Sequence, residues 1–349
     1  LKAIGIQMKL QKLELGAFLE NLYTKKMDAW MVSSYIPVPL DLKTVWHSDL
    51  EKTPNNFSSY QSEKTDKIVE ALDMRISEFE KKDLYKRFQE MIYQHYREHG
   101  RKFPWRMTQN PYHILVSEIM LQQTQVQRIM GKYEPFITLF PDFSSLARAP
   151  LRMVFREWQG LGYNRRAIAL KQIAQRVTEE FRGSLPSSVE TLITFPGIGR
   201  ATASSISTFA FHKPTVFIET NIRRVFIHNF FRGKTHIRDT EILPLVEKTL
   251  DASSPRDWYY ALMDYGVMLK QKYENPNRRS AHYQKQSPFQ GSNRQVRGMI
   301  LKALANESYI SECEIAQKLQ IDQEKLKNNL VQLEKEGFIK SKKKRFTLA

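Results

Sequence analysis

The stretch that decides the fold is Phe195–Phe226, which reads FPGIGRATASSISTFAFHKPTVFIETNIRRVF. Pro196, Gly197 and Gly199 interrupt an otherwise helical pattern, so a tight glycine turn is predicted between two helices. In such a helix-hairpin-helix, the glycines let the backbone approach a ligand closely. The N–H groups that open the second helix suit a phosphate. Most glycine turns merely link packed helices, so the assignment depends on the residues around this one.

Two carboxylates accompany the turn. Glu219 lies within the same stretch, directly before the run TNIRRV, and Glu118 lies upstream in the segment SEIMLQQTQ. The stretch therefore pairs a candidate phosphate grip with acidic side chains of the kind used in acid–base catalysis.

The net charge of +17 lies outside the first quarter of the chain. Residues 1–92 balance 14 Lys and Arg against 14 Asp and Glu, so the whole excess falls after them. An excess of this size indicates a polyanionic partner. Nucleic acid is favoured over an acidic membrane surface, because no basic amphipathic anchor is evident.

The number of cysteines limits the disulfides and metal clusters that the chain can form. Cys313 is the single cysteine, which excludes a disulfide within the chain and a metal cluster held by several cysteines. We therefore expect a reducing compartment. No apolar run is long enough to span a membrane, and the sequence from Leu1 shows no secretory signal.

Residues 1–92 differ from the rest in their pattern. Strands are predicted over 4–13 and 29–34, and helices over 15–26 and 66–91. The segments KAIGI, GAFLE, NNFSSY and DKIVEA resemble the C-terminal lobe of the extracellular peptide-binding proteins of ABC transporters. Those proteins bind peptide between two complete lobes. We interpret this α/β stretch, which lacks a partner lobe and a signal peptide, as a remnant or fusion without a transport role.

Residues 93–292 form the second predicted domain, which is helical almost throughout. Amphipathic windows are predicted over 111–130, 133–140, 151–161 and 165–181, separated by Pro, Gly and Asn turns. The first boundary lies within a helical stretch that either neighbouring domain could own.

Six motifs occur in order along this domain: GRKFPWR, SEIMLQQTQV, WQGLGY, FPGIGRATA, NIRRV and ALMDYG. Together they resemble the MutY-type adenine DNA glycosylases, members of the helix-hairpin-helix glycosylase superfamily, which removes damaged or mispaired bases. The resemblance covers Tyr93–Leu269, and LQQTQ after a glutamate is its most discriminating motif. It implies a two-lobed, all-helical core that acts on DNA.

The chemistry of such a reaction gives the two carboxylates different roles. Cleavage of the N-glycosidic bond needs a proton donor to the base and a negative group near the cationic sugar. By its position in the motif, the resemblance assigns the first role to Glu118. Burial on an apolar helix would suit this role, because it would raise the pKa of the carboxyl group. The alternative is a solvated glutamate at a helix N-terminus.

Glu219 aligns with the catalytic aspartate of the family, but it is one methylene longer. The extra bond would move the carboxylate by about 1.5 Å in an unchanged site, and a misplacement of about 1 Å can cost about 10²-fold in rate. The alternative is a helix-capping glutamate in an inactive domain.

The remaining site residues follow from the resemblance. Ala201 occupies the position of the Schiff-base lysine of bifunctional relatives, so the enzyme is expected to be monofunctional. Aromatic residues next to proline are also common in ordinary cores. The implied adenine pocket is Arg101, Phe103, Trp105 and Asp264, the wedge that replaces the flipped base is Gln123 and Tyr163, and the DNA contacts are Gly197, Gly199, Arg200, Asn221 and Arg223.

The family usually carries an iron–sulfur cluster after the ALMDYG motif. Residues 267–295 hold no cysteine and are rich in Lys, Arg and Asn, so no cofactor and no metal are expected. The histidines show no metal-ligand spacing. The positive charge of this loop is predicted to serve the role that the loop around the cluster has in relatives.

Residues 293–349 resemble a small winged-helix module. Helices are predicted over 295–304, 312–319 and 323–336, followed by a two-stranded wing with a Lys-rich tip. Such modules bind DNA or another protein, and the run KSKKKR favours phosphate. The Nudix-like domain with which relatives recognise 8-oxoguanine is not recognisable.

The sequence thus predicts a mainly α protein with an α/β fragment before the glycosylase core and a winged helix after it. The predicted function is hydrolysis of adenine opposite 8-oxoguanine or guanine in double-stranded DNA, by a cytoplasmic, nucleoid-associated monomer without a membrane partner. A thymine or uracil mismatch glycosylase and a catalytically silent DNA-binding protein remain as alternatives. A peptide-binding protein would require the missing lobe and an export signal.

Overall fold

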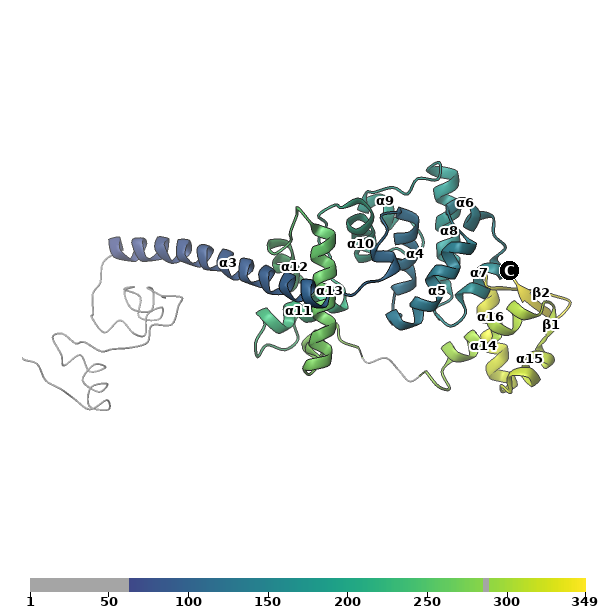
Figure 1. The fold of residues 1–349 in the computed structure, drawn as a ribbon. Coiled ribbons are helices and arrows are strands. Elements are labelled where there is room, and N and C mark those ends of the chain that lie inside the picture. Colours follow the sequence, from purple (N-terminus) through teal and green to yellow (C-terminus); the bar gives the residue numbers. More distant parts are fainter. Residues whose placement is uncertain (1–62, 285–288) are drawn as a thin grey trace, which may run out of the picture. The chain divides into compact units, whose positions relative to one another are not determined.

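The computed structural model describes residues 63–284 and 289–349, and this part is mainly helical (Figure 1). Helix α3, Glu63–His99, is longer than the predicted helix over 66–91. Contacts divide the chain between Phe88 and Gln89 and join everything from Gln89 onward in one unit. The strands and the first helix predicted for residues 1–62 lie outside the described residues. None of the described helices is both long and apolar enough to cross a membrane.

The helical core has two lobes. In the first lobe α4 packs against α5, α8 and α10, and α7 and α6 pack against α8. In the second lobe α11 packs against α12 and α13, and α10 touches α13 where the lobes meet. The bounds are η2 Pro104–Arg106, α4 Pro111–Leu121, α5 Val126–Leu139, α6 Phe143–Arg148, α7 Leu151–Trp158, α8 Arg165–Glu180, α9 Val189–Ile193, α10 Arg200–Phe211, α11 Thr220–Phe230, α12 Asp239–Lys248, α13 Pro255–Lys272 and η3 Pro276–Arg279.

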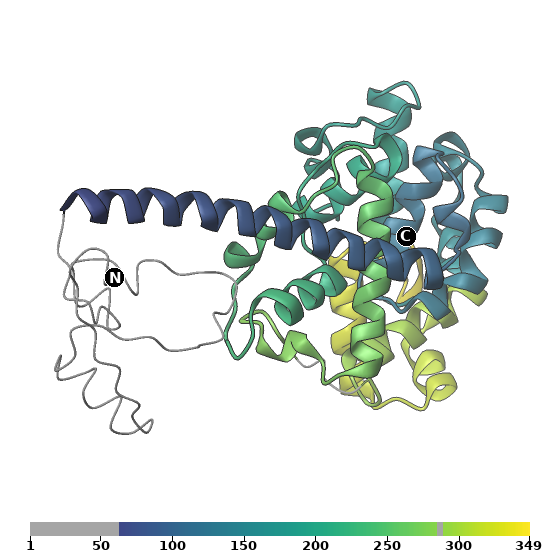
Figure 2. The same cartoon turned by 60° about the vertical axis from the view of Figure 1, so that its left-hand side comes forward.

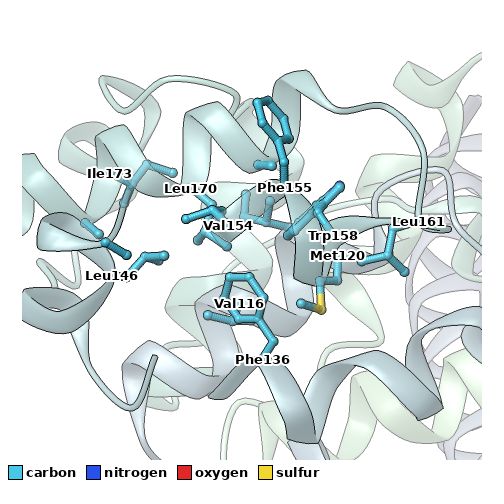
Figure 3. Packing of buried hydrophobic residues seen from close by; sticks show 14 of the residues in the cluster. Val116, Met120, Phe136, Leu146, Val154, Phe155, Trp158, Leu161, Leu170 and Ile173 are labelled. Atoms are coloured by element: carbon cyan, nitrogen blue, oxygen red, sulfur yellow. The ribbon is translucent and has the colours of Figure 1, made fainter. Parts of the chain in front are cut away.

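The first lobe is held by apolar side chains from its central helices. Figure 3 shows Phe136, Trp158 and Leu170 meeting in this interior from α5, α7 and α8, and all three are fully buried. The rings of Phe136 and Trp158 meet edge to face at 5.9 Å. Burial of side chains of this size contributes about 1.5–3 kcal/mol each, which makes the lobe a rigid support for the residues it carries.

One predicted helix is wrong in its extent. The window over 111–130 is two helices, because the chain leaves α4 after Leu121 and resumes as α5 at Val126. Gln123 between them has a left-handed φ of 52°. The break falls in the polar run QQTQ at residues 122–125, which contains neither glycine nor proline to mark it in the sequence.

Residues from Asn293 onward form three helices and a small sheet, an arrangement that fits the predicted winged helix. Three helices precede a hairpin, and a short strand between the first two helices completes a three-stranded antiparallel sheet with the order β1-β3-β2. Strand β1 was not predicted, because two residues give no alternation to recognise. The elements are α14 Asn293–Asn306, β1 Ile310–Ser311, α15 Glu312–Leu319, α16 Gln323–Lys335, β2 Ile339–Lys342 and β3 Arg345–Leu348.

The winged helix shares its hydrophobic core with the first lobe. Helix α14 packs on α7 (Figure 1), and Figure 2 shows the same helices from another side. Phe338 stacks near Phe155 with ring centroids 6.0 Å apart. Ile300 and Leu304 of α14 are fully buried in the same cluster as Trp158. The two modules are therefore continuous in their packing.

Candidate active site

The predicted hairpin is present, with α9 and α10 joined by residues 194–199. Gly197 has a φ of 75°, and a Cβ there would lie 3.1 Å from the Cβ of Ala169, so the turn requires glycine. Gly199 is the exposed N-cap of α10, and a Cβ on it would meet nothing within 4 Å. Open space over the N-terminus of a helix leaves room for a phosphate.

Glu118 projects from α4 toward α10. The hydroxyl of Ser205 donates a hydrogen bond to Glu118 Oε2 at 2.5 Å. The pKa of Glu118 is raised to about 7: burial is the largest cause and the negative charge of Glu219 adds to it, while the hydrogen bond from Ser205 and the charge of Arg106 act in the opposite direction. A carboxyl group with this pKa can keep its proton at neutral pH and give it to a base.

Glu219 is the N-cap of α11, so the capping role considered from the sequence is real. Its Oε1 accepts the backbone N–H groups of Asn221 at 2.6 Å and Ile222 at 2.9 Å. Burial raises the pKa of Glu219, while these two bonds and the charge of Arg224 counteract the shift. Its negative charge is one of the causes that raise the pKa of Glu118, so the two carboxylates are close enough to interact electrostatically.

The basic residues after Glu219 have partners within the protein. Arg224 donates to Asn221 Oδ1 at 2.7 Å and to the carbonyl of Gly266 at 2.6 Å. Arg223 forms a bidentate ion pair with Asp239, in which each of the two hydrogen bonds is 2.7 Å long. Arg200, in contrast, is exposed at the first position of α10.

Asp264 lies in a buried ion-pair cluster. Its carboxylate accepts two bonds from the guanidinium of Arg106, both at 2.9 Å, and others from the backbone and side chain of Arg101. Burial alone would raise the pKa of Asp264, but the bonds from Arg106 and Arg101 hold it below its usual range. Asp264 therefore remains ionised and fixes the segment that leads into α4.

The aromatic residues of this segment stack on one another. The rings of Phe103 and Trp105 are nearly parallel, with centroids 5.0 Å apart. Trp105 is buried within the core of the first lobe, and Phe103 packs against that core from the partly exposed side. Arg106 lies over the ring of Tyr260 at 4.4 Å, which continues the stack toward α13.

Gln123 and Tyr163, the predicted wedge, lie on two loops with similar backbone geometry. Both residues are exposed, with φ values of 52° and 47°. The buried guanidinium of Arg166 holds both loops. It donates to the carbonyls of Gln122 at 2.6 Å and Gly162 at 3.0 Å.

The segment after α13 does not fit an iron–sulfur cluster, because the whole chain holds only Cys313 and that residue lies on α15. Polar contacts hold the segment instead. Asn277 donates to the carbonyl of Thr220 at 2.9 Å, and Arg279 donates to the carbonyl of Ile227 at 3.0 Å. Among the described residues, no group of three or more His, Cys, Asp or Glu side chains is placed to hold a metal ion.

Three residues of the site were missed from the sequence: Ser205, Arg106 and Arg166. Ser205 is buried on the face of α10 that meets α4. A serine within the apolar periodicity of a helix is a recognisable signal, because a buried hydroxyl needs a partner. Most arginines in a sequence of this composition lie at the surface. The burial of Arg106 and Arg166 can therefore be recognised only from the fold.

The family model of the HhH-GPD superfamily of base excision DNA repair proteins matches residues 116–247, and this is the class that the hairpin and the paired carboxylates define. A solved thermostable thymine-DNA glycosylase is similar, with a TM-score of 0.50 and 25% identity over 57% of this chain and 92% of that one. A second model, of the TFIIE alpha subunit, matches residues 290–346.

Two curated relatives are adenine DNA glycosylases. The protein of Buchnera aphidicola is 36% identical over 52% of this chain and 52% of its own length, so this chain spans about half of that relative. The protein of Mycolicibacterium smegmatis is 32% identical over 60% of this chain and 78% of its own length. This chain belongs to the adenine DNA glycosylase family.

Proposed function

We propose that this protein removes adenine mispaired with 8-oxoguanine or guanine from double-stranded DNA. The observation that carries the proposal is the pair of carboxylates: Glu118, with its pKa raised to about 7, faces a hydroxyl and lies within the electrostatic influence of Glu219. Membership of the adenine DNA glycosylase family supports adenine as the base.

In the proposed reaction Glu118 donates its proton to the adenine ring as the N-glycosidic bond breaks. Positive charge then develops on the sugar, and the carboxylate of Glu219 stabilises it before water attacks. The N-cap bonds orient the Glu219 carboxylate, and the positive end of the α11 dipole favours its charge. Ala201 is exposed at the second position of α10 and supplies no amine, so we infer hydrolysis without strand cleavage.

Binding of the duplex is assigned to the same face. Gly199 and Arg200 at the start of α10 are proposed to bind a phosphate, while Gln123 and Tyr163 are proposed to fill the space left by the extruded base. The shared support of Arg166 favours a joint role for the two wedge residues, because one guanidinium holds both loops. We further propose that the protein acts as a monomer, without an iron–sulfur cluster, at the nucleoid.

The test is single-turnover release of adenine from a duplex with adenine opposite 8-oxoguanine. The wild-type protein should release adenine and leave an abasic site that breaks only after alkali. Glu118→Gln should slow release by about 10²–10⁴-fold and keep DNA binding, because the amide has nearly the same shape but no acidic proton. Glu134→Gln, at an exposed position of α5, is the matched control and should leave the rate unchanged. Cleavage without alkali, or release of thymine and not adenine, would contradict the proposal.

A second candidate is a DNA-binding protein without catalytic activity. The observation that favours it is the occupation of Glu219 Oε1 by two backbone N–H groups. Glu219→Asp separates the candidates. If the wild type is active, shortening the side chain should slow release, whereas a wild type that is inert and becomes active on this substitution is a binding protein.

A further inference from the structure

The residue that follows the last helix of the winged helix contacts the glycosylase lobe. Glu336, the C-cap of α16, accepts hydrogen bonds from Arg297 of α14 at 2.6 Å and from Arg165 of α8 at 3.1 Å. Its side chain is only 12% exposed. Burial alone would raise the pKa of Glu336, but the two guanidinium groups hold it below its usual value, so the bridge remains charged.

This bridge ends beside the wedge. Arg165 is the first residue of α8, two positions after Tyr163. A second contact joins the same places, because Arg294 at the start of α14 lies 3.3 Å from the hydroxyl of Tyr163, to which it donates. Two separate elements of the winged helix therefore contact the loop at residues 162–165.

The winged helix is itself fixed firmly enough to hold that loop. Arg152 of α7 donates to the carbonyls of Ala305 and Asn306, each at 2.8 Å, and so binds the end of α14. The Phe155–Phe338 stack and the shared apolar core add contacts on the same side. Movement of the module relative to the first lobe would break these contacts together.

We propose that the C-terminal winged helix is a positioning element for base extrusion, which holds the loop that carries Tyr163 through Glu336 and Arg294. The proposal rests on the wedge role of Tyr163 in the proposed function. A cavity of about 450 Å³ opens between the module and the hairpin, with Glu336, Arg165, Gln122 and Gly197 in its lining. The winged helix thus lies next to both the glycine turn of the hairpin, where phosphate binding is proposed, and the loop that carries Tyr163.

The consequence is a specific kinetic effect. Extrusion of a base from the stack costs a few kcal/mol, and it costs least where the base has no pairing partner. A loosened wedge should therefore slow the release of a paired adenine more than the release of an unpaired one. A general loss of folding would slow both alike.

The test uses Glu336→Gln in the full chain and two duplexes, with adenine opposite 8-oxoguanine or opposite an abasic site. We expect release from the paired duplex to slow by about tenfold, which corresponds to about 1.4 kcal/mol, and release from the unpaired one to change by less than about twofold. Glu324→Gln is the control, an exposed carboxylate on the same helix that should behave as wild type. In a Tyr163→Ala background, Glu336→Gln should add no further loss.

Equal slowing on both duplexes, no slowing on either, or an added loss in the Tyr163→Ala background would each overturn the proposal. A catalytically inert wild type would defeat the proposed function and leave this inference open to a binding assay. With 2-aminopurine in place of the target adenine, unstacking raises fluorescence on binding. Glu336→Gln should reduce that rise at saturating protein, and an unchanged rise would contradict the positioning role.

Discussion

The pKa of Glu118 is the quantity on which the chemistry depends at the scale of single residues. Burial and the charge of Glu219 raise it, the hydrogen bond of Ser205 lowers it, and the result is about 7. The group therefore keeps its proton in mildly acidic solution and loses it as the pH rises through 7. Because the pKa in the folded state exceeds the unfolded value of 4.5, the contribution of Glu118 to stability is fully present below the unfolded value and is lost as the pH rises from there through about 7.

Ser205→Ala tests this balance. Removal of a hydrogen bond that lowers the pKa of Glu118 should raise it, so that the protonated acid persists to higher pH. The alkaline fall of the single-turnover rate of adenine release should move to higher pH. Ser204→Ala, at the neighbouring buried position, is the control and should leave the profile in place. A profile that stays fixed or moves to lower pH in Ser205→Ala would show that Glu118 is not the titrating acid.

The sequence was sufficient to propose Glu118 and Glu219 as the catalytic pair, because each lies inside a motif with a definite order along the chain. It was not sufficient for Arg166 or Arg106. Their roles depend on burial, and burial of an arginine is decided by carbonyls and carboxylates from segments distant in sequence, such as Asp264 for Arg106. Hydrogen bonds and ion pairs between residues distant in sequence leave no periodic pattern that could be recognised in the sequence.

At the scale of elements, the packing of α11 against α13 determines the position of Glu219, because Glu219 is the N-cap of α11. Gly266 lies where the two helices meet, and a Cβ there would come within 2.5 Å of the backbone oxygen of Asn221. Its carbonyl also accepts the bond from Arg224. The last residue of the ALMDYG motif is therefore a packing requirement, which keeps the N-terminus of α11 close to α13.

Gly266→Ala should push α11 away from α13 and cost about 1–3 kcal/mol of stability, because the clash is with backbone and cannot be relieved by a side-chain rotation. The rate of adenine release should fall as well, since Glu219 begins the displaced helix. Gly131→Ala in α5 is the matched control: a Cβ there meets nothing within 4 Å, and the change should stabilise the protein by about 0.5–1 kcal/mol. Denaturant unfolding measures both, and a neutral Gly266→Ala would refute the packing argument.

Most helices could be predicted from the sequence, and the failures share one cause. The break after Leu121 and strand β1 both depend on local backbone geometry within a few residues. In the first case Arg166 fixes a loop of polar residues that contains no glycine or proline to reveal it. In the second, pairing of Ile310 with Phe346 across the sheet defines a strand too short to show alternation.

At the scale of the whole molecule, the packing of the first lobe and the winged helix bears on how the protein unfolds. Their buried side chains form one cluster, from Trp105 in η2 to Leu348 at the end of β3. A separate DNA-binding appendage would have its own core and a mobile connection. The sequence could indicate the module but not its docking, because surface-facing apolar residues on α7 and α14 resemble ordinary core positions until both helices are placed.

We therefore expect the glycosylase lobe and the winged helix to unfold in one cooperative transition. All five tryptophans lie outside the module, and Cys313, the single cysteine, is exposed on α15 within it. Trp105, Trp158 and Trp258 lie in the two lobes, whereas Trp30 and Trp46 precede them. In a variant with Trp30 and Trp46 replaced by phenylalanine, tryptophan fluorescence and a dye attached to Cys313 thus follow the two parts separately during urea unfolding. Coincident midpoints are expected, because loss of the module would expose the apolar surface of α7, including Phe155, to water. If the dye signal changes at a clearly lower urea concentration than the tryptophan signal, the module is an independent domain, and the rigid hold on Tyr163 through Glu336 loses its physical basis.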